Sequence, residues 1–161
     1  NNPKLYDTLF GPFRHVSLAA EEAWLEKRMQ YDPNNVHLII ALSPGDEPIG
    51  LINLLNIDLF SRQAHMNFFI GESVERGKGY GTAAANEILN IAFNELGLHR
   101  IQSYFLVDNY PSIHACKKCG YREEGILRKY VYKGGEYHDA LVMSVLKEEW
   151  PGLQAIRPND K

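Results

Sequence analysis

The chain has 161 residues, of which 45% are hydrophobic and 23% are charged. This is the composition of an ordinary globular protein, and the length suits a single domain with a sizeable core. A formal charge of -3 and a pI near 6.1 argue against nucleic acid as the main partner. The apolar run at residues 38–42 suits a strand and is too short to span a membrane.

Hydrophobic periodicity and turn residues predict alternating helices and strands. In chain order we expect a helix at 17–30, strands at 36–42, 49–57 and 64–70, a helix at 80–96, a strand at 101–107, a short helix after Pro111, and strands at 122–132 and 136–146. Gly97 and Gly120 fit the left-handed positions that end the second and third helices. The strand at 101–107 is apolar on both faces, which predicts cover on both sides. This order suits one mixed sheet flanked by helices.

The whole of residues 1–150 is expected to form one domain. The two last strands are joined by Lys133, Gly134 and Gly135, which is typical of a hairpin. Residues 151–161 are polar and contain proline, which predicts a mobile tail.

The junction between the third strand and the second helix carries the clearest chemical signal. Three glycines alternate there with Arg76 and Lys78. Glycine lets the backbone approach a ligand closely, and the helix start behind it offers unpaired N–H groups and a positive dipole end. The two cations add charge where a pyrophosphate would sit. The segment therefore predicts a phosphate-binding loop.

Three kinds of phosphate-binding loop compete for this segment. A Walker loop needs a glycine where the chain has Glu72 and a hydroxyl where it has Gly79, so it is excluded. A dinucleotide fingerprint needs a glycine in place of Thr82, although Asp108 could serve as the ribose acid, so this alternative is weakened but open. The third pattern, Arg/Gln-x-x-Gly-x-Gly/Ala, is met at every fixed position by residues 76–81.

Residues 76–81 therefore resemble the pyrophosphate loop of the GNAT superfamily of N-acetyltransferases. Residues 124–128 and 135–139 are similar to the branch that holds ribosomal-protein N-terminal acetyltransferases and spermidine acetyltransferases; residues 96–101, 109–113 and 117–121 resemble further family segments. The resemblance covers roughly residues 1–150. It implies an α/β (α+β) fold with a single mixed, mostly antiparallel sheet flanked by helices. The family has one more strand ahead of this point, so we expect the chain as given to lack its first strand.

The resemblance implies an enzyme that binds acetyl-CoA and an amine together, so that the amine attacks the acetyl group directly. The strand end would pair with the pantetheine arm, which requires the third and fourth strands to splay apart, and the loop would hold the pyrophosphate. The implied cofactor-binding residues are Phe69, Ile70, Gly71, Arg76, Gly77, Lys78, Gly79, Tyr80, Gly81, Thr82, Asn109 and Lys118. Asn109 is equally explained as a helix cap, and Lys118 as part of a solvated basic face.

Proton transfer is where the chain departs from the family. Many relatives carry a tyrosine seven residues after the asparagine, and this chain has Cys116 there. Cys116 and Ser112 are candidate catalytic acids, although both are also read as packing residues. A backbone N–H near Ile70 or Gly71 is the expected donor to the oxyanion. No base stands out, and the candidates are Glu22, His65, Glu72 and His138.

The two cysteines, Cys116 and Cys119, have the spacing of a zinc half-site or a redox pair. The sequence has no further cysteine and no His-x-x-x-His pair to complete a zinc site. Gly120 places the pair at a helix end where the dipole disfavours thiolate. We expect no metal and two reduced thiols in a cytoplasmic protein.

The acceptor stays open at this point. A protein N-terminus, a polyamine, an amino sugar and an antibiotic all suit the resembled branch, and a homodimer through an edge strand is compatible with it. Two other classes remain: a CoA-binding sensor or scaffold without turnover, which the absent tyrosine favours, and a dinucleotide-binding oxidoreductase.

Overall fold

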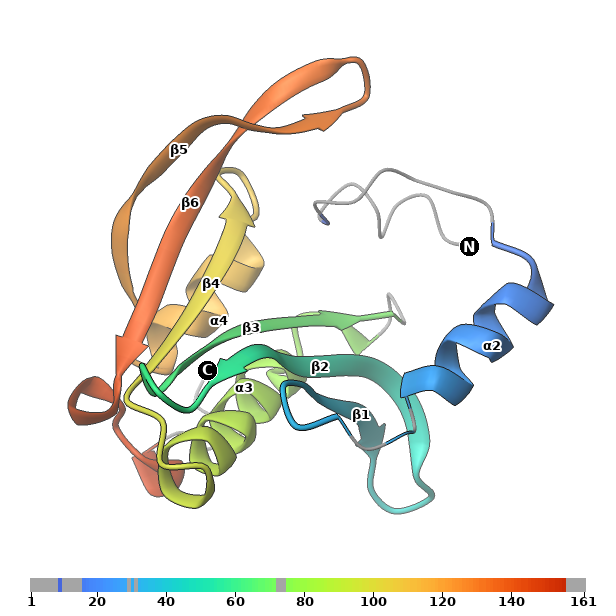
Figure 1. Ribbon diagram of the computed structural model, residues 1–161, viewed down its shortest axis with the longest axis horizontal. Coiled ribbons are helices and arrows are strands. Elements are labelled where there is room, and N and C mark those ends of the chain that lie inside the picture. Colours follow the sequence, from blue (N-terminus) through green and yellow to red (C-terminus); the bar gives the residue numbers. More distant parts are fainter. Residues whose placement is uncertain (1–8, 10–15, 29, 31, 72–74, 156–161) are drawn as a thin grey trace.

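The computed structural model describes residues 9, 16–28, 30, 32–71 and 75–155 (Figure 1). Its strands are β1 (Val36–Leu42), β2 (Glu47–Asp58), β3 (Gln63–Ile70), β4 (Arg100–Leu106), β5 (Arg122–Lys133) and β6 (Glu136–Leu146). Its helices are α2 (Leu18–Arg28), α3 (Tyr80–Asn90), the π-helical turn η2 (Ile91–Glu95), α4 (Tyr110–Lys118) and the 3₁₀ turns η3 (Lys147–Glu149) and η4 (Leu153–Ala155). The predicted order is confirmed, with ends that shift by a residue or two for most elements.

The six strands form one sheet in the order β1-β2-β3-β4-β6-β5. Only β3 and β4 are parallel, and the other neighbouring pairs are antiparallel. This confirms the mixed, mostly antiparallel sheet. The expected absence of a first strand concerns residues outside the described ranges.

The helices α3 and α4 pack on one face of the sheet and against each other (Figure 1). The core lies between them and the strands, and its fully enclosed side chains include Leu54, Ile88, Phe93, Ile101 and Val145. Alternate residues of β3, Ala64 and Met66, point into this core. His65, Asn67 and Phe69 therefore lie on the opposite face, which we call the open face.

The expectation that the fourth strand is covered on both sides holds only at its end, where Leu106 is 4% exposed. On β4, Ile101, Ser103 and Phe105 are buried toward the helices, whereas Gln102 and Tyr104 are only partly buried on the open face. The physical reason is that both helices lie on the same side of the sheet.

The helix expected at 80–96 changes its geometry near its end. Beyond Asn90 the chain forms a π-helical turn, and the Leu96 N–H donates to Ile91 O at 2.9 Å. This wider turn keeps both Ala92 and Phe93 fully buried. Gly97 adopts φ 64°, which confirms its predicted left-handed conformation.

The strands β3 and β4 diverge after a short contact. They pair only from Gln63↔Arg100 to His65↔Gln102. Beyond that point the two halves of the sheet separate as the arms of a V (Figure 1). At the divergence the Ser103 hydroxyl donates to Met66 O at 2.9 Å, so this carbonyl keeps a partner without the ladder. The splay that the resemblance requires is confirmed.

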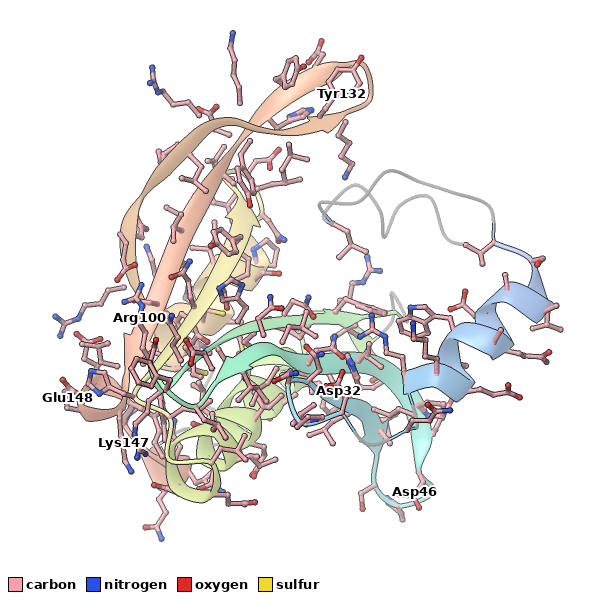
Figure 2. The ribbon with its side chains drawn as sticks, viewed as in Figure 1. Asp32, Asp46, Arg100, Tyr132, Lys147 and Glu148 are labelled. Carbon is pink, nitrogen blue, oxygen red and sulfur yellow. The ribbon has the colours of Figure 1, made fainter. Side chains whose placement is uncertain are left out.

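The hairpin of β5 and β6 rises away from the body of the domain, with Tyr132 near its tip (Figure 2). Its turn uses Gly134 at φ 61° and Gly135 at φ 89°, as expected. A bulge in β5 places Lys129 at φ 53°, and its N–H donates to Asp139 Oδ1 at 2.7 Å. His138 Nε2 lies 3.1 Å from Lys133 O. Both side chains therefore stabilise the hairpin.

The start of the expected tail contacts α3. Trp150 Nε1 donates to Asn86 Oδ1 at 2.7 Å, and Asn86 Nδ2 donates to Leu153 O at 3.4 Å. Residues 156–161 lie outside the described part, so the tail and the domain boundary at residue 150 stay predictions. Among the described helices, none is long and apolar enough to cross a membrane.

Candidate functional site

A cavity of about 600 Å³ lies where β3 and β4 diverge. Its wall is made by the end of β3, the glycine-rich loop, the first turn of α3 and one face of α4. Most of the predicted site residues line it: Phe69, Ile70, Arg76, Gly77, Gly79, Gly81, Thr82, Asn109, Ser112 and Lys118. The fold therefore brings two sequence segments, about 30 residues apart, into one binding site.

The glycine loop leaves main-chain donors available to a ligand. Gly79 adopts φ 90° and caps α3 without a side-chain hydrogen bond, so within the described part of the chain the first N–H groups of the helix have no side-chain partner. Gly77 also has a positive φ, 78°. A Cβ on Gly81 would lie 2.8 Å from Phe68 Cε2. Small residues thus keep the cavity open beside a set of unpaired amides, which fits a pyrophosphate.

The two cations of the loop, Arg76 and Lys78, bind groups of the protein itself, and only Arg76 lines the cavity. Arg76 donates from Nε to Ile70 O at 3.0 Å and from Nη2 to Gly71 O at 3.2 Å. Two of its five N–H donors therefore tie the loop to the strand end, and the side chain also lines the cavity. Lys78 forms an ion pair with Glu75 at 3.0 Å and does not line the cavity.

The ladder between β2 and β3 decides which main-chain groups face the cavity. The Gly71 N–H donates to Ile49 O at 2.8 Å. Along an antiparallel strand every second residue is hydrogen-bonded to the neighbouring strand, so Phe69 is likewise paired with β2. The N–H groups of Phe68 and Ile70 point the other way, toward the divergence. This corrects the prediction for Phe69 and Gly71 as main-chain partners of a ligand, and it leaves Ile70 in that role.

The short helix α4 contributes the opposite wall. Asn109 caps it, because its Oδ1 accepts the Ser112 N–H at 3.4 Å, and the cap reading of Asn109 is confirmed. The same wall includes three residues that were not predicted as site residues, Pro111, His114 and Ala115. Helical spacing from Ser112 and Lys118 could have found them. Leu9 also lines the cavity, and no pattern in the sequence indicated that it would.

The structure contradicts the prediction that Cys116 is a catalytic acid. Its side chain is 0% exposed and belongs to the core, and it does not line the cavity. Burial, with a smaller effect of Cys119, raises the pKa of its thiol well above the usual range, which disfavours the thiolate that a proton donor leaves behind. Both cysteines are free thiols, as expected.

An aromatic and imidazole cluster lies on the open face at the divergence. The rings of His65 and Tyr104 meet edge to face at 5.5 Å, and Tyr104 stacks on Tyr130 at 5.9 Å. Gln102 Nε2 donates to the Tyr104 hydroxyl at 2.5 Å. Partial burial lowers the pKa of His65, so the imidazole is neutral at pH 7 and able to accept a proton. Of the other candidate bases, Glu22 is exposed on α2, and Glu72 lies outside the described residues.

An ion pair fixes the charge beside this cluster. Arg100 binds the Glu124 carboxylate, which also accepts from the Ser144 hydroxyl at 2.6 Å (Figure 2 labels Arg100). The hydrogen bond from Arg100 first, and that from Ser144 second, lowers the pKa of Glu124 to about 2. This carboxylate is therefore charged and already paired at neutral pH.

Comparison with known proteins gives a consistent result. The acetyltransferase (GNAT) domain family matches residues 1–122. YdaF of Bacillus subtilis, which carries the name of a ribosomal N-acetyltransferase, is 38% identical over 103 residues, or 64% of this chain and 56% of that protein. The spermidine N(1)-acetyltransferase of Vibrio cholerae is 31% identical over 102 residues, or 63% of this chain and 58% of the relative. The chain thus spans little more than half the length of these two relatives.

A solved structure supports the same fold over more of the chain. The spermidine N-acetyltransferase from Vibrio cholerae, crystallised with CoA and spermine, superposes with a TM-score of 0.82 and 26% identity. The match covers 92% of this chain and 86% of that one.

Proposed function

This chain belongs to the GNAT acetyltransferase family, and on that premise we propose that it transfers the acetyl group of acetyl-CoA to a primary amine. The acceptor is a protein N-terminus or a small amine such as a polyamine, and it attacks directly in a ternary complex. The observation that carries the proposal is the cavity at the divergence of β3 and β4, with unpaired amides at one end. The names of the relatives support both acceptor classes.

The chain's own groups suit the binding of the coenzyme. The amides at the start of α3 hold the diphosphate, and Arg76 and Lys118 add positive charge from the two facing walls of the cavity. The main chain of Phe68 pairs with the pantetheine arm, since its polar groups face the divergence, whereas the Ile70 carbonyl already accepts from Arg76. Lys78 and Tyr80 remain predicted contacts from the sequence.

The remaining groups suit acetyl transfer. Acetyl-CoA supplies an activated thioester carbonyl when bound. The Ile70 N–H donates to the oxygen that becomes negative during attack. His65 takes the proton of the amine through water, because it is the neutral base beside the divergence. Ser112, which lines the cavity, donates a hydrogen bond to the departing sulfur.

The proposal is tested with calorimetry and a thiol-release assay. We expect CoA to bind with 1:1 stoichiometry and free thiol to appear when acetyl-CoA is mixed with a peptide or polyamine acceptor. Absence of CoA binding would refute the proposed site. The cytoplasmic location and the homodimer stay predictions from the sequence.

One observation favours a second function, a CoA-binding module without turnover. The residue at the position of the family's tyrosine, Cys116, is buried and offers no proton to the cavity. Tight binding of CoA together with no thiol release above buffer, for any amine tested, would decide for this alternative.

A further inference from the structure

Three polar residues form a row across the open face of the sheet. His37 on β1 lies directly opposite Asn53 on β2, and Asn53 lies directly opposite Asn67 on β3. His37 Nδ1 is 2.6 Å from Asn53 Oδ1, and Asn53 Nδ2 is 2.7 Å from Asn67 Oδ1. Asn53 is only 7% exposed, so the middle of the row is shielded from bulk water. We call His37, Asn53 and Asn67 the polar row.

The row begins at a residue that can only donate. Arg28 Nη1, from α2, lies 2.6 Å from His37 Nε2 and 3.2 Å from Nδ1. Arg28 also packs over the Trp24 ring at 4.7 Å, which helps to hold it in place. Because a guanidinium has no acceptor, His37 Nε2 must accept this hydrogen bond. The ring proton that donates onward therefore lies on Nδ1.

The direction of every following bond is fixed by this start. His37 Nδ1–H donates to the Asn53 oxygen, so the Asn53 amide nitrogen is the donor to Asn67. The Asn67 oxygen is therefore used, and its exposed NH₂ group is presented at the end of the row. This polarity follows from Arg28 and does not depend on the choice between the two orientations of each amide.

The end of the row lies beside the proposed reaction site. Asn67 is two residues from Phe69 on the same face of β3, about 7 Å along the strand, and Phe69 lines the cavity. The carboxylate on this face next to the divergence, Glu124, is already paired with Arg100. Among the described residues, the sheet thus presents a hydrogen-bond donor and a paired carboxylate here, whereas the exposed carboxylates of α2, Glu21, Glu22 and Glu26, are in no ion pair.

We infer that the polar row selects an acceptor whose amine lies next to a carbonyl, as in a peptide N-terminus, and disfavours a polyamine. A peptide carbonyl, two bonds from the reactive nitrogen, accepts from the Asn67 amide. A polyamine offers only N–H donors and positive charge. It therefore forms no hydrogen bond with the Asn67 NH₂ group and gains no binding energy from it. The inference rests on the proposed function, and it makes Asn67 a specificity-determining residue of that site.

The test compares acceptors that differ in one carbonyl. A tripeptide amide is measured against the same compound with its first carbonyl reduced to methylene, and against spermidine. We expect kcat/KM for the peptide to exceed the other two by about tenfold or more, the value of one hydrogen bond of this kind. Equal or better use of spermidine or of the reduced compound would overturn the inference.

The matched variant is Asn67→Asp, which keeps the oxygen that Asn53 donates to and replaces the exposed NH₂ by a negative oxygen. We expect kcat/KM for the peptide to fall about tenfold and that for spermidine to rise, with CoA affinity unchanged. The control is Asn90→Asp, since Asn90 Oδ1 likewise accepts from a neighbouring asparagine, Asn94, on the helix side of the sheet. It should leave the ratio unaltered.

The outcomes separate the two claims. An unchanged peptide-to-spermidine ratio in Asn67→Asp, with an unaltered melting curve, would overturn the role of the polar row while acetyl transfer stands. No thiol release from the wild-type protein with any of the acceptors would instead refute the proposed function, and the inference with it.

Discussion

The two sides of the sheet build their parts of the site from different materials. On the helix side, the cavity wall combines the backbone amides and three glycines of the loop with one face of α4, and it comes from two short continuous segments. On the open face, the polar groups are side chains from six different elements, α2 and β1 to β5. Main-chain groups suit a ligand whose phosphates never vary, whereas side chains can be exchanged to suit a particular acceptor. Substitutions on the helix side should therefore change coenzyme binding by filling the cavity. Substitutions on the open face should change activity by altering proton transfer and charge.

The sharpest test of the helix side is Gly81→Val. Its Cβ would lie 2.8 Å from the Phe68 ring, so the branched side chain must displace that ring or fill the cavity. We expect CoA affinity, measured by calorimetry, to fall by about 100-fold or more, which is about 2.7 kcal/mol. Gly125→Val is the matched control, because nothing lies within 4 Å of an added Cβ there. Undiminished CoA binding by Gly81→Val would place the coenzyme elsewhere.

The open face is tested at His65. Because burial lowers its pKa from the ordinary value of 6.5, His65 becomes a neutral base as the pH rises through a value below 6.5, and kcat/KM should show an acid limb there. His65→Ala should reduce kcat by about 100-fold and abolish that limb, with little change in CoA affinity. His138→Ala, which removes an imidazole from the hairpin, is the control. An acid limb that persists in His65→Ala would exclude this residue as the base.

Arg76 has two roles in the proposed site. Its side chain binds main-chain carbonyl groups and so holds the loop, and it also adds positive charge. Arg76→Ala should weaken CoA binding by about tenfold and reduce its dependence on salt. The comparison is Arg62→Ala, whose guanidinium binds the Gly97 carbonyl at 3.0 Å far from the cavity. Equal CoA affinity in the two variants would show that Arg76 is only structural.

The ion pair on the open face predicts a pH-dependent stability. The pKa of Glu124 is lowered from its ordinary 4.5 to about 2, so its contribution is present above pH 4.5 and is lost as the pH falls toward 2. Because the carboxylate is 38% exposed, we expect Glu124→Gln to cost only about 1 kcal/mol at pH 7. Urea titrations at several pH values measure it, with Glu123→Gln as the control. A difference that persists unchanged at pH 2 would contradict this origin.

The smallest expected effects on kcat distinguish the two candidate acids, Ser112 and Cys116. Ser112→Ala removes a hydroxyl that lines the cavity, and we expect kcat to fall about fivefold, the value of one neutral hydrogen bond. Cys116→Ala changes a core side chain, so it should lower the melting temperature and leave kcat within about twofold of the wild type. A larger loss of kcat in Cys116→Ala than in Ser112→Ala would restore the thiol as the acid.

The sequence by itself determined the elements and one half of the site. Alternation and turn residues located the six strands, and the loop at residues 76–81 with Asn109 predicted the proposed coenzyme side, because glycine and cap positions are local requirements of the backbone. It could not show that Gly71 donates to Ile49 or that Cys116 is enclosed. Both depend on which face or edge of a strand or helix meets another element.

Only the tertiary structure decided the open face. The row from His37 to Asn67 joins residues 30 positions apart, and its polarity is set by Arg28 on a different element. No local pattern marks such residues, since each one alone resembles a solvated polar side chain. Strand register brings them together, and register is a property of the assembled sheet.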